Sequence, residues 1–319
     1  MCGIIHTKRY DNKSVAKITE KRYQKQKQRG MDGFGYCALR NGKLEAIVLD
    51  TAETGILAKL EKENADEIMF HHRLPTSTPN LIEATHPIVV KNDKLKYNYY
   101  VINNGIITNA DALLAEHKKR GFNYTTKMTK KIITEINTYG QDYFNDSEAL
   151  AIELALRLEG KKETIDAYGS IAFIALQVEK QTDEVTNLYF GRNYGSPLCI
   201  EEGKGFISIK SEGGKSLMTN TLYCLNYATN KITEDYEQIG YYEQMGFASL
   251  IGNETKTSFS DEDEDGYWEL KDEEMELENA LKRAQAEGNC DMEAEHWLEL
   301  EYIKRELKQY DKRKKQSYY

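Results

Sequence analysis

The second residue of the chain is a cysteine, in the opening stretch MCGII. Once Met1 is removed, Cys2 carries a free α-amine next to its thiol. The amine has a pKa of about 7.7–8.0 and the thiol one of about 8.5, so the amine can accept the thiol proton near neutral pH. A residue that supplies both nucleophile and base is suited to acyl transfer through a covalent intermediate. Cys2 is therefore a candidate catalytic residue, whose substrate needs binding groups elsewhere in the chain.

Eight short motifs, the first of which contains Cys2, occur in order along the chain. They are CGI (2–4), RGMDGFG (29–35), HHRLPTS (71–77), THP (85–87), NNGII (103–107), NDSEAL (145–150), YGSIAF (168–173) and RNYGSPL (192–198). Together they resemble the class II, or N-terminal nucleophile (Ntn), glutamine amidotransferase domain, the glutaminase half of glucosamine-6-phosphate synthase and of glutamine phosphoribosylpyrophosphate amidotransferase. The resemblance covers roughly residues 2–215. It implies hydrolysis of L-glutamine through a γ-glutamyl thioester on Cys2.

Three residues are candidates for binding glutamine. The guanidinium of Arg73 offers a rigid fork of donors that suits a carboxylate, and the resemblance implies that it binds the α-carboxylate. Thr76 would add a hydrogen bond at the same end of the substrate. Asp146 would pair with the substrate ammonium. Because Asp is also a common helix N-cap, Asp146 could serve as a cap for the helix that follows it.

The resemblance assigns the remaining site residues as well. The side-chain amide of Asn104 and the backbone N–H of Gly105 match the oxyanion hole, which stabilises charge on the tetrahedral intermediate. Read alone, the NNG stretch would be a turn between strands. Arg29 and His86 are expected to support the site, Arg29 as an organiser of the loop near the nucleophile and His86 as a packing residue.

Three positions depart from the family pattern, namely Leu74, Ser77 and Asn103. They leave the lid over glutamine and the acceptor of its nitrogen unassigned. We expect a stand-alone glutaminase that passes ammonia to a separate synthase in trans. Two alternatives stay open: a hydrolase of another γ-glutamyl amide, and a non-catalytic interaction protein on the same fold.

Strand-like and helix-like runs alternate over the first 250 residues. Stretches rich in β-branched and aromatic residues predict strands at 2–6, 33–39, 44–50, 67–74, 97–107, 169–179, 187–192, 205–211 and 221–228. Helices are predicted at 13–28, 54–65, 110–120 and 145–159. The mixed order favours an α+β fold of mostly antiparallel sheets with helices outside. The resemblance makes this a four-layer αββα Ntn-hydrolase sandwich.

The charge balance changes near residue 251. Residues 251–319 hold 20 acidic and 11 basic side chains, which accounts for the whole net charge of −9. We therefore expect three parts: the amidotransferase domain at 1–250, an acidic linker at 251–266 and a charged helical hairpin at 267–319. The hairpin carries a heptad-like apolar stripe and could dock a partner or a second copy of the chain.

Several classes of function are disfavoured. The five cysteines are scattered and include no CxxC pair, which argues against a disulfide framework or a zinc site and for a reducing compartment. No motif for a phosphate loop or a metal site is present, so no cofactor and no metal are expected. The chain lacks a general basic face for nucleic acid, an apolar run for a membrane and a secretory signal. A cytoplasmic location is expected.

Overall fold

The computed structural model describes residues 2–75, 80–126, 144–240 and 261–287, together with residues 292, 296, 300, 303 and 304. The chain divides into two compact units, Met1–Tyr242 and Glu243–Tyr319. The candidate site residues that the structure describes all belong to the first unit. Thr76 and Ser77 lie outside the described residues.

Sheet A of the first unit has seven strands in the order β11-β9-β10-β1-β4-β2-β3. Their bounds are β1 Gly3–Arg9, β2 Phe34–Arg40, β3 Lys43–Asp50, β4 Glu67–His72, β9 Cys199–Gly203, β10 Phe206–Lys210 and β11 Lys215–Ser216. The neighbouring strands all pair antiparallel. The N-terminal strand β1 is central, between β4 and β10, and this position fixes the start of the chain inside the fold.

Sheet B has six strands in the order β13-β12-β8-β7-β6-β5. Their bounds are β5 Ile88–Val90, β6 Tyr97–Ile107, β7 Gly169–Glu179, β8 Val185–Arg192, β12 Thr221–Asn226 and β13 Lys231–Tyr236. These strands also pair antiparallel. The two long strands β6 and β7 pair along their whole length and form the centre of this sheet.

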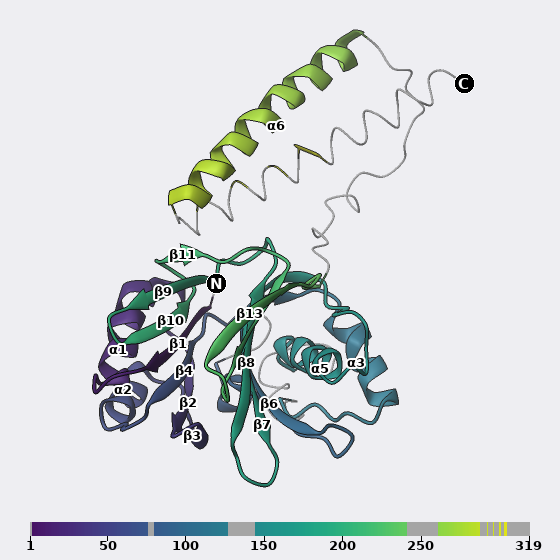
Figure 1. Ribbon diagram of the computed structural model, residues 1–319. Helices are drawn as coiled ribbons and strands as arrows, with labels where there is room; N and C mark the ends of the chain where they lie inside the picture. The colour runs from purple at the N-terminus through teal and green to yellow at the C-terminus, as the bar shows by residue number, and fades with distance from the viewer. Residues whose placement is uncertain are drawn as a thin grey trace. The chain divides into compact units, whose positions relative to one another are not determined.

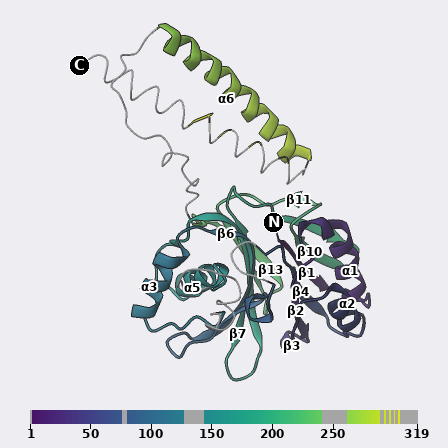
Figure 2. The same ribbon diagram turned by 180° about the vertical axis from the view of Figure 1, so that it is seen from behind.

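Helices cover the outer face of each sheet (Figures 1 and 2). Helices α1 (Val15–Gln26) and α2 (Glu53–Glu61) pack on sheet A, while α3 (Ala110–Lys119) and α5 (Ser147–Leu158) pack on sheet B. Short 3₁₀ turns, η1 (Lys27–Arg29) and η2 (Ile82–Ala84), lie in the connections. The first unit is thus the predicted α+β sandwich of four layers, and this prediction is confirmed.

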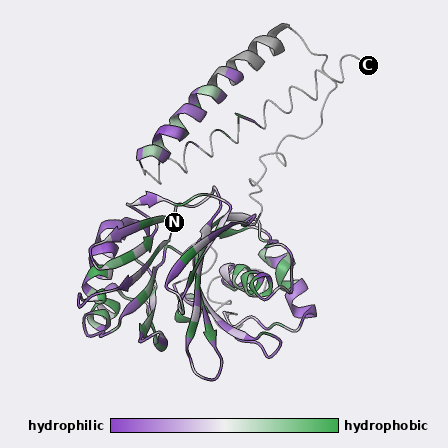
Figure 3. Ribbon diagram, in the orientation of Figure 1, coloured by the Kyte–Doolittle hydropathy of each residue, from purple (hydrophilic) through white to green (hydrophobic). Residues whose placement is uncertain are grey.

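Three apolar clusters fill the spaces between the layers. One lies between α1, α2 and sheet A, one between the two sheets, and one between sheet B and the helices α3 and α5. Helix α5 is mostly green in Figure 3 because most of its residues are apolar, and ten consecutive residues from Ser147 to Leu156 are buried. Such a helix is held by packing on all sides, so its N-terminal end is a fixed point in the fold.

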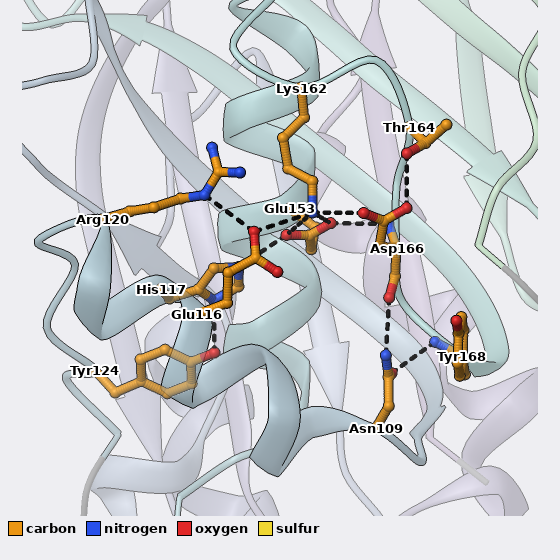
Figure 4. Close-up of polar contacts among 10 residues, drawn as sticks. All are labelled: Asn109, Glu116, His117, Arg120, Tyr124, Glu153, Lys162, Thr164, Asp166 and Tyr168. Atoms are coloured by element: carbon orange, nitrogen blue, oxygen red, sulfur yellow. Dashed lines mark hydrogen bonds and ion pairs between the residues drawn. The ribbon is translucent and has the colours of Figure 1, made fainter.

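A buried polar cluster joins α3 and α5 (Figure 4). The carboxylate of Glu153 is fully buried and lies 2.8 Å from His117 Nε2 and 2.7 Å from Lys162 Nζ. Tyr124 Oη is 2.8 Å from the other imidazole nitrogen of His117, and Glu153 also accepts the N–H of Asp166 at 2.8 Å. These partners compensate the desolvation of the carboxylate and tie α5 to its neighbours.

Some predictions need correction. Helix α6 spans Asp261–Glu287, so residues 261–266 of the predicted linker are helical, because acidic side chains are favoured in the first turn of a helix. The rest of the linker, 251–260, lies outside the described residues. Most of the second helix of the predicted hairpin does as well, although Lys304 Nζ lies 3.1 Å from Glu278 Oε1 of α6. Cys2, Cys37 and Cys224 are free thiols.

Candidate active site

Cys2 is held by contacts at the start of β1. The N–H of Ile4 donates to Ser211 Oγ at 3.1 Å, and the N–H of Ser211 donates to the carbonyl of Ile4 at 3.0 Å. Arg29 Nε donates to the carbonyl of Cys2 at 3.2 Å, and its guanidinium also pairs with Glu212 at 3.0 Å. Arg29 therefore holds the backbone of the candidate nucleophile, which agrees with a supporting role.

The thiol of Cys2 lies beside two charged groups. Its Sγ is 3.6 Å from the carbonyl oxygen of Leu74. Burial raises the pKa of Cys2; the neighbouring Arg73 guanidinium opposes this rise, and the Asp146 carboxylate adds to it. Both charges thus lie within electrostatic reach of the sulfur, although they come from different sheets. Arg73 follows β4, and Asp146 precedes α5 on sheet B.

The glycine-rich loop at 29–35 fixes the backbone of Arg73. The N–H of Asp32 donates to the carbonyl of Arg73 at 2.9 Å, and the N–H of Arg73 donates to the carbonyl of Gly33 at 2.9 Å. A Cβ on Gly30 would lie 2.4 Å from the carbonyl carbon of Arg73. Gly30 is therefore needed for the loop to approach Arg73 this closely, and the motif RGMDGFG acts on the site through Arg73.

The pleat of the strands directs the candidate residues into one layer. Ile4 and Met69 belong to the cluster between the sheets. Cys2 lies two residues before Ile4 and Arg73 four residues after Met69, so both are directed to that same layer. Gly3 pairs with His72, which places Cys2 opposite Arg73.

Sheet B contributes Asn104 to the candidate site, from the side opposite Cys2 and Arg73. Ile102 on β6 belongs to the same cluster between the sheets, and Asn104 follows it by two residues, so its side chain is directed toward sheet A. Asn104 is fully buried, and within the described part of the chain neither its amide oxygen nor its amide nitrogen makes a hydrogen bond. A buried amide is costly without partners, so Asn104 is well suited to bind a ligand.

The N–H of Gly105 points away from β7. Thr108 donates its N–H to Tyr168 at the β7 side at 2.8 Å, whereas Ile107 donates in the opposite direction to Asp146 Oδ2 at 2.7 Å. Since successive N–H groups of a strand alternate between its two edges, the N–H of Gly105 shares the edge of Ile107. A Cβ on Gly105 would lie 1.9 Å from the carbonyl oxygen of Ser170, so only glycine fits here.

Asp146 does not cap helix α5. Its side chain makes no capping hydrogen bond; instead, Asn145 Oδ1 accepts the N–H of Ser147 at 3.0 Å. Asn145 is anchored in turn, because its Nδ2 donates to the carbonyl of Ala84 at 2.7 Å. The possible capping role of Asp146 is therefore wrong, and its carboxylate is oriented by the N–H of Ile107.

The neighbouring histidines have different environments. His72 Nδ1 donates to the carbonyl of Gly30 at 2.8 Å and Nε2 accepts from Gln26 at 3.0 Å. Burial lowers its pKa to about 4. His71 and His86 are stacked with ring centroids 4.0 Å apart, and burial lowers the pKa of His86 to about 3. All three imidazoles are therefore neutral near pH 7.

Sequence reasoning missed several groups at this site. The carbonyl of Leu74, the hydroxyl of Ser211 and the amide of Gln26 all contact the backbone or side chains around Cys2, but a backbone carbonyl or a distant serine carries no sequence signal. The described residues include no group of three or more potential metal ligands. No described helix is long and apolar enough to cross a bilayer.

No protein-family model and no curated protein sequence matches the chain. Among solved structures, glutamine phosphoribosylpyrophosphate amidotransferase from B. subtilis matches with a TM-score of 0.51 at 16% identity, over 74% of this chain and 49% of that one. A structure described as the allosteric regulatory enzyme of purine biosynthesis matches with a TM-score of 0.52 at 15% identity, over the same shares of the two chains. The chain thus spans about half the length of these proteins. At these identities the likeness establishes only that the chain shares its fold with part of these two proteins.

Proposed function

We propose that the chain hydrolyses the side-chain amide of L-glutamine with Cys2 as the nucleophile and supplies the ammonia to a separate synthase. One observation carries this proposal: the Cys2 thiol lies within electrostatic reach of both Arg73 and Asp146. A free amino acid presents a carboxylate and an ammonium, and these two side chains offer the matching charges beside a nucleophile.

Substrate binding follows from these charges. The Arg73 guanidinium binds the α-carboxylate, and the Asp146 carboxylate binds the α-ammonium. Thr76 adds a hydrogen bond to the same end of glutamine. Charge-assisted bonds of this kind are about twice as strong as neutral ones, and together they direct the substrate side chain toward Cys2.

The chemistry then proceeds in two steps. The Cys2 sulfur attacks the amide carbon of glutamine while the α-amine takes the thiol proton, and the oxyanion is held by the Asn104 amide and the Gly105 N–H. The amine returns the proton to the leaving nitrogen, so that ammonia departs and a γ-glutamyl thioester remains. Water attacks the thioester, the Cys2 sulfur leaves with a proton, and glutamate is released.

We propose that the second unit of the chain docks the synthase that accepts the ammonia. The second unit, residues 243–319, includes the long charged helix α6. We assign the acceptor reaction to another protein, which the helical segment 267–319 would dock.

The test begins with the N-terminus. Intact-mass spectrometry should find Met1 removed, and the purified protein should release glutamate and ammonia from glutamine in equal amounts. Cys2→Ala should abolish both products, and Asn104→Ala should lower kcat about 10²–10³-fold through loss of one oxyanion donor. Faster turnover of a larger γ-glutamyl amide would assign a different substrate. Retained Met1 with no labelling of Cys2 by an electrophilic glutamine analogue would contradict the proposal.

A further inference from the structure

His71 and His86 form a buried pair whose hydrogen-bonding capacity is largely unused. Both are at most 2% exposed, and their rings are stacked at 4.0 Å. Among the residues the structure describes, neither ring nitrogen of His86 has a hydrogen-bond partner, and His71 has only a contact with the backbone of Asn103. The adjacent His72 is a contrast, because both of its nitrogens are bonded. Because buried polar atoms normally have hydrogen-bond partners, we expect this pair to bind a small ligand.

The pair lies directly behind the candidate nucleophile. In sheet A, His71 stands opposite Ile4, one residue row deeper than Cys2 and Arg73. His71 shares the face of Met69, so its ring is directed into the layer between the sheets. The ring also lies close enough to the Asn103 backbone to affect its titration. His71 thus reaches across the layer toward the strand that carries the proposed oxyanion hole.

The chemistry of the pair suits a small neutral molecule. Burial and the neighbouring Arg73 keep the pKa of His86 low, and burial and His86 do the same for His71. A neutral imidazole offers one donor and one acceptor. An additional cation is disfavoured here because Arg73 already carries a positive charge. Buried waters in proteins typically bond about three otherwise unsatisfied polar groups, and the two stacked rings provide nitrogens for such a water.

We propose that His71 and His86 form a water site behind Cys2 that supplies the water for hydrolysis of the acyl intermediate. The inference rests on the proposed function. The water oxygen bonds to the thioester carbon, the carbon–sulfur bond breaks, and the water proton passes to the α-amine. The imidazoles orient the water by hydrogen bonds and take up no proton. They are positioning residues, and they act on the second step of the reaction only.

Partition of the intermediate tests this assignment. Hydroxylamine added with glutamine competes with water for the thioester and gives γ-glutamyl hydroxamate. His71→Phe and His86→Phe keep a flat ring and remove the nitrogens. Each should slow the attack of water about tenfold, the effect of 1.4 kcal/mol, and raise the ratio of hydroxamate to glutamate by the same factor. His72→Phe is the matched control, because it alters the opposite face of the same strand.

The outcomes separate this inference from the proposed function. A raised ratio in both variants and an unchanged ratio in His72→Phe support the water site. An unchanged ratio in folded variants, or the same rise in the control, overturns the water site but leaves the proposed glutamine hydrolysis intact. Absence of any hydroxamate with the unaltered protein contradicts the glutaminase itself. Should the variants fail to fold, a high-resolution crystal structure decides: a water bonded to both rings is expected, and a dry layer there overturns the inference.

Discussion

Replacement of Gly30 by alanine tests how the glycine-rich loop controls the site. The φ of Gly30 is 176°, an extended value that alanine also adopts, so the change acts through space alone. The added Cβ would lie 2.4 Å from the carbonyl carbon of Arg73 and 2.7 Å from the nitrogen of Leu74. Both are backbone atoms and cannot turn away, so the segment must move by about 1 Å to reach ordinary contact.

The expected consequence is large for activity and moderate for stability. A 1 Å misplacement of a positioning group costs about 10²-fold in rate, and overpacking costs about 1–3 kcal/mol. We expect kcat/KM for glutamine to fall about 10²-fold while the protein stays folded, as measured by ammonia release and urea unfolding. Gly42→Ala is the control for activity: its Cβ meets nothing within 4 Å, and its φ of 74° means that it loses stability by backbone strain away from the site, so kcat/KM should stay unchanged. A kcat/KM within threefold of the unaltered protein would refute the role given to Gly30.

Three further changes have defined outcomes. Asp146→Asn keeps an acceptor for the N–H of Ile107 but removes the charge, so KM for glutamine should rise at least tenfold with little change in the urea midpoint. The folded pKa values of His72 (about 4) and His86 (about 3) lie below the ordinary value near 6.5. Below pH 6.5 the unfolded chain therefore takes up protons that the folded protein does not, and the free energy of unfolding should fall as the pH drops from 6.5 toward 3. Because His86→Phe removes one of these groups, the fall should be less steep in that variant. Tyr124→Phe removes the hydrogen bond to His117 and should cost about 1 kcal/mol of stability with unchanged glutamine turnover; a loss of turnover would show that the cluster of Figure 4 acts on the site.

Residue patterns predicted the long strands of both sheets, whereas the short strand β5 and the exposed strand β13 were not predicted. The predicted strands 97–107 and 169–179 have the bounds of β6 and β7, because long apolar runs with β-branched residues leave little choice. Strand β13 was missed: all six of its residues are exposed, so they show no alternation of apolar and polar side chains. Backbone pairing with β12, and not a pattern of side chains, makes this segment a strand.

The candidate site also combines features that the sequence indicated with features that depend on tertiary contacts. The types of Cys2 and Arg73 suggested a nucleophile and a carboxylate-binding group, the family resemblance supplied the expected role of Asn104, and the structure directs all three into one layer. The competition between Asn145 and Asp146 for the helix cap could not be resolved from the sequence, because both residue types are good caps. Only the anchoring of Asn145 to Ala84 decides it. The stacking of His71 on His86 likewise depends on an approach between distant segments.

The central position of β1 has a consequence for the order of synthesis. One neighbour of β1 is β10, and the bonds that hold Ile4 come from Ser211, about two hundred residues later in the chain. While the ribosome makes the intervening segment, one edge of β1 has no native partner. The N-terminal end is then open to processing enzymes, and its thiol is not yet set against Arg73. Cys2 is thus among the first residues to be translated, whereas the strand that follows it gains its second neighbour only after β10 is made, so cutting the chain short before β10 would leave one edge of β1 unpaired.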